Sequence, residues 1–365
     1  MKRTILQKAA AAALFVLLTA ALLAAADFLL VDDVHSYSRV MLQELYADAG
    51  NIDTLFLGSS HCYRSVDPAA VDAALGTYSF NAGSSQQLPD GSYYMLREAA
   101  AENDLKTVYL EMFYTGYNES RSANVPMACY LLTDHMSAAS PNRYEYLWEM
   151  GGLAGFADLL LPARHGIASP RAMPALWRAK LTDGYDPGNY AYVSYPDSGE
   201  AYRGRGFIYT QGVPKYGFGT LLDVDADAPL SDFGWEYLTK IADFCEENGI
   251  RLVLFTAPLP SGYLYNTDNY QSYVDALNTF CAARDGLVYW DFSLWRDWDT
   301  LHLTVGDYSD AHHLNAAGAD KFTAVLCDTI RRDAAGENVA DLFYDSVEDK
   351  LTLTPDESIL MKDVH

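Results

Sequence analysis

Two short strings of polar residues, far apart in the chain, carry side chains suited to nucleophilic catalysis. The first is Gly58-Ser59-Ser60-His61, and the second, roughly 250 residues later, is Asp310-Ala311-His312-His313-Leu314-Asn315. Asp310 lies three residues before His313, a spacing that lets one turn of chain bring the carboxylate to imidazole Nδ1 while Nε2 faces elsewhere. These residue types predict a serine nucleophile at Ser60, a base at His313 and an orienting acid at Asp310.

The sequence around both strings is typical of loops in an α/β protein. The apolar run 54–57 predicts a buried strand that ends at Gly58, and Asp67-Pro68 predicts the start of a helix. His313 lies just before an expected helix over 316–332, and α/β proteins build their sites at such loop ends. Each string alone also fits a structural role, because Gly-Ser-Ser is common in loops and an aspartate before a histidine can cap a helix.

Alternating strand and helix patterns predict the fold class. The expected strands are 54–57, 77–80, 107–113, 251–256 and 287–292, and the expected helices between them are 92–102, 235–248, 270–284 and 316–332. This alternation predicts an α/β protein in three layers, with a parallel sheet covered on both faces by helices.

Residues 1–31 have the composition of a signal-anchor or transmembrane segment. Lys2, Arg3 and Lys8 precede an apolar run from Ala9 to Ala26 that continues, after one aspartate, through 28–31. This length approaches the roughly 20 residues that span a bilayer. The positive flank predicts an N-terminus inside the cell and a single-pass protein of the cell membrane, with its main domain on the extracytoplasmic side.

A removed signal peptide is the alternative, since Ala24-Ala25-Ala26 satisfies the small-residue rule for cleavage. Residues 32–50 are expected to form a linker helix that lifts the domain off the membrane. The main domain is expected over 51–335, with a C-terminal extension over 336–365 that forms a hairpin.

The segment 114–228 breaks the alternation of strands and helices. It is rich in Tyr, Gly, Pro and Arg and carries turn signals, so it is expected to be an insertion packed over the sheet edge. Its string Arg203-Gly204-Arg205-Gly206-Phe207 offers cations that could hold a phosphate-bearing polymer. The alternative is that these residues only satisfy carbonyl groups of an irregular fold.

Charge and cysteine content exclude some function classes. The net charge of −24 disfavours nucleic acid as a partner. The five cysteines have no metal-ligand spacing, and an odd number cannot form a complete disulfide framework. Cys62, close to Ser60, is a rival nucleophile that is better explained as a packing residue.

On these residues, the chain resembles the SGNH (GDSL-type) hydrolases. Within them it is similar to the membrane-anchored envelope acyl-transfer proteins related to the teichoic acid D-alanine transfer protein and the alginate acetylation proteins. The resemblance covers about residues 51–113 and 229–333 and implies a flavodoxin-like sheet. It implies that Ser60, the third residue of Gly-x-Ser, is the nucleophile, and that Asp310 and His313 form the late Asp-x-x-His.

The resemblance also implies an oxyanion hole made by the amides of Ser60 and Gly83. One departure is that the Gly-x-Asn-Asp block expected after the third strand is absent, and Leu110-Glu111-Met112-Phe113 stands there instead. The envelope branch often lacks that asparagine. Asn81 and Gln86 are possible substitutes for the missing donor, and they can equally serve only to fold their loop.

Other residues are expected to contact the substrate. They are His61, Gln86, Glu111, Arg203 and Arg205. No cofactor is expected. A metal is not expected either, because adjacent histidines do not easily point the same way and the acidic residues lack regular spacing.

The expected function is an extracellular, membrane-anchored serine O-acyltransferase or esterase. Its substrate would be an acyl group of a cell-envelope polysaccharide or teichoic-type polymer, passing through an acyl-serine intermediate. By resemblance, a multi-span membrane O-acyltransferase could supply the donor. The alternative from another class is a non-catalytic polymer-binding or assembly protein with a degenerate fold of the same family.

Overall fold

A five-stranded parallel sheet forms the centre of the protein in a computed structural model, which describes residues 2–118, 125–155, 167–182, 199–212 and 223–353. The order of its strands is β2-β1-β3-β6-β7. Their bounds are β1 Thr54–Leu57, β2 Ser79–Asn81, β3 Thr107–Glu111, β6 Arg251–Thr256 and β7 Val288–Asp291. Counted along the sheet, this is the flavodoxin-like order 2-1-3-4-5, so the α/β prediction is confirmed.

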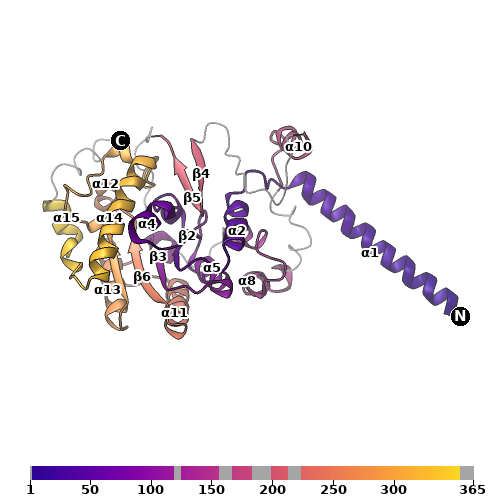
Figure 1. The fold of residues 1–365 in the computed structure, drawn as a ribbon, viewed down its shortest axis with the longest axis horizontal. Helices are drawn as coiled ribbons and strands as arrows, with labels where there is room; N and C mark the ends of the chain where they lie inside the picture. Colours follow the sequence, from indigo (N-terminus) through magenta and orange to yellow (C-terminus); the bar gives the residue numbers. More distant parts are fainter. Residues whose placement is uncertain (1, 119–124, 156–166, 183–198, 213–222, 354–365) are drawn as a thin grey trace.

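Alternate residues of each strand enter two separate cores, which makes the domain three-layered. Leu55 and Leu57 pack with one cluster and Phe56, between them, with the other. The first core is covered mainly by α2 (Tyr37–Ala47), α5 (Pro89–Glu102), α11 (Asp232–Glu247) and α13 (Tyr270–Ala282). The second is covered by α4 (Pro68–Leu75) and α14 (Ala316–Ala334), as Figure 1 shows.

The expected strands and helices between β1 and α14 are all present; β1 and β6 have the expected ends, and the others are shifted at one or both ends. The second strand is displaced to 79–81 because its pairing with β1 begins only at Ser79. The third strand ends at Glu111, two residues early. Helix α4 begins at Pro68 behind the Asp67 cap, as the sequence predicted.

The helix expected within 32–50 is present as α2, and it packs on the domain, because Met41 and Leu42 are fully buried in the first core. The expected C-terminal hairpin is replaced by η4 (Ala340–Leu342) and the helix α15 (Val347–Leu353). The segment that follows α14 is anchored on the domain by Phe343, which packs against Phe292 and Trp295.

The described parts of the inserted segment contain regular structure. Their elements are α6 (Tyr114–Asn118), α7 (Val125–Thr133), α8 (Pro141–Gly151), α10 (Met173–Thr182) and a hairpin of β4 (Glu200–Gly204) and β5 (Phe207–Thr210). Helices α7 and α8 pack in the first core. The turn of the hairpin lies against the edge strand β2, where the Asn81 amide donates to the Arg205 carbonyl at 2.9 Å.

Helix α1 (Lys2–Leu30) projects away from the domain (Figure 1). Its stretch Ile5–Leu30 is long and apolar enough to cross a membrane, and none of it is buried in the protein. These features fit a membrane anchor or a signal sequence. The end of α1 is held by Lys180 of α10, whose ammonium donates to the carbonyls of Phe28 and Val31, both at 2.7 Å.

Replacing Gly206 by alanine is expected to loosen the hairpin from the sheet. Gly206 has φ +83, and a Cβ there would lie 1.7 Å from the Asn81 carbonyl oxygen, so the backbone must move. Strain and overpacking together should lower the free energy of unfolding by about 2–4 kcal/mol, measured by urea denaturation. Gly204→Ala is the matched control, since Gly204 has φ +98 but open space around it. Equal losses in the two variants would contradict the packing argument.

Candidate active site

Ser60 lies at a sharp corner after β1, at the carboxyl edge of the sheet. The corner is possible because residue 58 is glycine, with φ +145, where a Cβ would stand 2.6 Å from the Cβ of Glu111 at the end of β3. The short helix α3 (Ser60–Tyr63) follows, capped by the Ser59 hydroxyl, which accepts from the His61 amide at 3.3 Å. The adjacent ends of β1 and β3 are the point where strand order reverses, the usual ligand position in such sheets.

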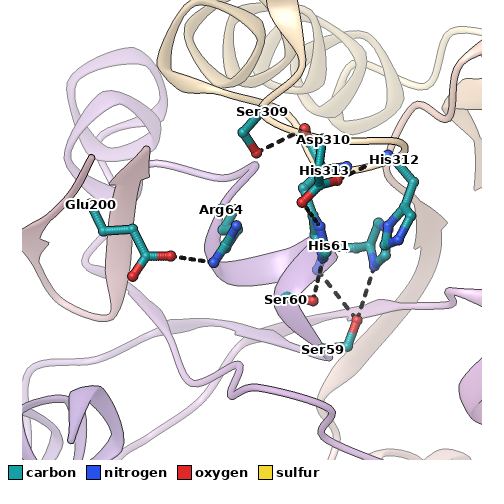
Figure 2. Close-up of polar contacts among 9 residues, drawn as sticks. All are labelled: Ser59, Ser60, His61, Arg64, Glu200, Ser309, Asp310, His312 and His313. Atoms are coloured by element: carbon teal, nitrogen blue, oxygen red, sulfur yellow. Dashed lines mark hydrogen bonds and ion pairs between the residues drawn. The ribbon is translucent and has the colours of Figure 1, made fainter. Parts of the chain in front are cut away.

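The structure brings Ser60, His313 and Asp310 into one hydrogen-bonded line (Figure 2). Ser60 Oγ is 2.6 Å from His313 Nε2, and His313 Nδ1 is 2.7 Å from Asp310 Oδ2. With the Nδ1 proton donated to the carboxylate, Nε2 is the lone-pair nitrogen and accepts from the serine hydroxyl. This is the arrangement of an activated serine nucleophile.

Asp310 also holds the loop that carries His313. Its Oδ1 accepts from the amides of His312 (3.0 Å) and His313 (2.9 Å). Burial alone would raise the pKa of Asp310, but the hydrogen bonds from the ring and amides of its neighbours outweigh it and hold that pKa well below the usual range. The loop ends at Asn315, whose side chain caps α14 and donates to the Tyr308 carbonyl at 3.2 Å.

His61 and His312 lie directly beside this line. The His61 ring is 3% exposed, stacks on Phe113 at 3.6 Å between centroids, and places Nε2 2.9 Å from His312 Nδ1. Burial, with help from the neighbouring imidazoles, lowers the pKa of His61 well below its usual value and that of His312 to about 4. Both are therefore neutral at pH 7. The expectation that adjacent histidines diverge is wrong, since the His312 and His313 rings are 4.2 Å apart.

Glu111 lies buried beneath the corner that Gly58 forms. Its Oε2 accepts from the Ser59 hydroxyl at 3.3 Å, and among the described side chains its Oε1 has no hydrogen-bond partner. Burial raises the pKa of Glu111 to about 8. The thiol of Cys62 is fully buried as well, which raises its pKa, and it donates to Asn81 Oδ1 at 3.3 Å, so it packs rather than competes with Ser60.

The residues expected to form the oxyanion hole do not all face the cavity beside Ser60. Asn81 points away from the serine, because its Nδ2 donates to the carbonyls of Cys62 (3.0 Å) and Val66 (3.1 Å). Gly83 is buried against the Gly58 and Ser59 carbonyls, and its amide donates to Asn81 Oδ1 at 3.2 Å. Gln86 does line the cavity, exposed and with φ +54. Asn81 is thus a scaffold residue, and Gln86 is the better placed of the two substitutes.

Arg203 and Arg205 lie on the hairpin, away from the lining of the catalytic cavity. Arg203 stacks over the Tyr209 ring at 4.4 Å. Arg205 forms an ion pair with Asp72 and stacks over Tyr78 at 5.1 Å. Neither arginine lines the cavity, and Arg205 fixes the hairpin turn to the sheet edge, so a contact of either with substrate stays a prediction.

A cavity of about 400 Å³ opens over the catalytic line. Besides the residues above, Arg64 lines it, a residue that the sequence reasoning missed although it lies four positions after Ser60, one helical turn away. Arg64 forms an ion pair with Glu200 of β4 (Figure 2). A second cavity of about 550 Å³ adjoins the first, shares Tyr63, Arg64 and Ser85 with it, and reaches Phe28 at the end of α1.

Comparisons with known proteins give little further information. A family that carries no descriptive name matches residues 224–335. No curated protein matches the chain. Among solved structures, a "putative acylhydrolase" from Bacteroides fragilis NCTC 9343 is similar, with a TM-score of 0.37 and 11% identity over 80% of this chain and 94% of that chain. A likeness this distant supports no argument about function. The argument therefore rests on the geometry of the site.

Replacing Glu111 by glutamine is expected to change how stability depends on pH. Because the pKa of this carboxyl rises from 4.5 to about 8 on folding, the folded chain holds a proton there that the unfolded chain releases, and stability falls as pH rises through that window. The glutamine variant lacks this loss. The free energy of unfolding of the variant minus that of the wild type should therefore increase by up to about 1.4 kcal/mol per pH unit between pH 5.5 and 8. Urea denaturation at both pH values measures this, and a difference that does not change with pH would disprove it.

Proposed function

We propose that this protein is a serine acyl-transfer enzyme of the SGNH type, either an O-acyltransferase or an esterase. The observation that carries the proposal is the continuous line from Ser60 Oγ through His313 to Asp310, with separations of 2.6 and 2.7 Å. It lies at the carboxyl ends of β1 and β3, beside a cavity that can admit a substrate.

In the proposed reaction, His313 Nε2 takes the proton of Ser60 as Oγ attacks an acyl carbonyl. The donor alcohol leaves with that proton, and the acyl group stays on the serine as an ester. A second hydroxyl, from an acceptor or from water, then attacks the ester and loses its proton to His313. The bond between the acyl group and Ser60 breaks, the new ester or acid leaves, and His313 returns the proton to Ser60 Oγ. Asp310 keeps the imidazole in the required tautomer and stabilises its charged form.

The negative charge on the acyl oxygen needs hydrogen-bond donors. The Ser60 amide, the first of α3, has no partner within its own helix and is one proposed donor. Gln86, which lines the same cavity, is proposed as the second. The Gly83 amide can join them only after exchanging its bond to Asn81.

For the setting, we propose a single-pass cell-membrane protein, anchored by α1, with its catalytic domain on the extracytoplasmic side. The proposed substrate is an acyl group of a cell-envelope polysaccharide or teichoic-type polymer, with a multi-span membrane O-acyltransferase as the donor partner. The length and composition of α1 support the anchor, and the net charge of −24 disfavours nucleic acid.

One observation favours a second candidate, a non-catalytic polymer-binding or assembly protein. The Gly83 amide, which would be an oxyanion donor in an SGNH enzyme, is already bonded to Asn81. An impaired oxyanion hole would leave a site that binds without turnover, since one donor is worth about 3–4 kcal/mol in such sites.

Labelling with a fluorophosphonate probe separates the two candidates. The full-length protein in detergent should be labelled at Ser60, as mapped by mass spectrometry, and the label should vanish in Ser60→Ala and His313→Ala because nucleophile and base are both required. His302→Ala is the matched control, since His302 is exposed and stacks on Trp298. A folded protein without label, or with label elsewhere, would favour the binding protein.

Asp310→Asn is expected to slow labelling far more than it destabilises the fold. The amide oxygen can still accept from the His312 and His313 amides and hold the loop, but the carboxamide cannot stabilise a charged imidazole. The labelling rate should fall by about 10³- to 10⁴-fold, while the melting temperature changes by a few degrees. A rate within tenfold of the wild type would show that Asp310 does not orient the base.

A further inference from the structure

Three imidazole rings gather in the cavity, each with one nitrogen near a nitrogen of the other two. One ring nitrogen each from His61, His312 and His313 lies within 4.8 Å of the others, the one such group in the described part of the chain. The closest pair, His61 Nε2 and His312 Nδ1, is 2.9 Å apart. Tetrahedral Zn²⁺ with bonds of about 2.0–2.1 Å needs nitrogens about 3.3 Å apart. The His61 plane lies 21° from that of His312 and 26° from that of His313, so the rings must turn out of this stacking for their lone pairs to meet at one ion.

The groups behind the rings are those that orient histidine ligands. The His313 Nδ1 atom is bonded to the Asp310 carboxylate at 2.7 Å. On the other side, His61 Nδ1 is 3.3 Å from the Ser59 hydroxyl, which donates to the buried carboxyl group of Glu111 at 3.3 Å. Metal-ligating histidines characteristically use their second nitrogen in this way, and such partners fix the ring and the tautomer.

We propose that His61, His312 and His313 form a binding site for one divalent transition-metal ion of the Zn²⁺ type. Imidazole nitrogen suits Zn²⁺, Co²⁺ and Ni²⁺, and the cavity leaves the fourth coordination position open to water. Figure 2 shows the three residues together beside Ser60, and their ring centroids are 4.2–4.9 Å apart.

A regulatory consequence rests on the proposed function. The His313 Nε2 lone pair, which accepts from Ser60 at 2.6 Å, is the same one that would bind the metal. It cannot accept the serine proton while it holds a cation. Metal occupancy therefore switches the serine off, and removal of the metal restores it without any covalent change.

The test uses full-length, tag-free protein in detergent, stripped with a chelator. Calorimetric titration with Zn²⁺ alone should show one site per chain, and Co²⁺ should give the visible absorption of a tetrahedral complex. His61→Gln and His312→Gln should each weaken Zn²⁺ binding at least tenfold, and His302→Gln should leave it unchanged. His312 is only partly buried, so its variant serves if loss of the buried His61 ring unfolds the protein.

The metal site and its effect on Ser60 are tested by different results. Ser60→Ala keeps all three histidines, so it should bind Zn²⁺ even if no serine chemistry exists. Absence of a stoichiometric site, or binding that survives both glutamine variants, would overturn the metal site. In the wild type, Zn²⁺ should suppress fluorophosphonate labelling of Ser60 in proportion to occupancy, and the chelator should restore it. Labelling that persists at full occupancy would overturn the regulatory step alone.

Discussion

The buried carboxamide of Asn81 holds the catalytic corner together. Helix α3 has only four residues, too few to be stable by itself, and its end is fixed because Asn81 Nδ2 donates to the carbonyls of Cys62 and Val66. Both of its amide protons are thus used, and its Oδ1 accepts from Gly83 and Cys62. A side chain on the neighbouring strand therefore sets the position of Ser60. The backbone amide of Asn81 also donates to the carbonyl of Arg205 in the hairpin turn.

The second half of the site, with His313, lies 253 residues after Ser60 in the chain. The parallel sheet makes this possible, since its carboxyl ends share one edge and His313 precedes a helix that packs on that sheet. The long insertion between β3 and α11 does not prevent the contact, because each doubling of loop length adds only about 0.6 kcal/mol of closure entropy. The catalytic line consequently exists only in the folded domain.

Sequence patterns predicted the parts of the fold that local rules control. Alternation of strands and helices predicted the parallel sheet, and Asp67-Pro68 predicted the start of α4. The role of Asn81 could not be predicted, because a polar residue after a strand looks the same whether it faces a substrate or satisfies two carbonyls. The place of Arg205 depends on Asp72, far away in the sequence, and the C-terminal segment became a helix although its apolar residues alternate as in a strand.

The end of α1 also shapes the surroundings of the site, whatever the fate of the apolar segment. Phe28 and Val31 line the second cavity, which shares Tyr63 and Arg64 with the catalytic cavity. Cleavage after Ala26 would leave both residues in the mature protein, so the cavity wall would survive in either form. If α1 stays in place as an anchor, that cavity opens where the helix meets the domain.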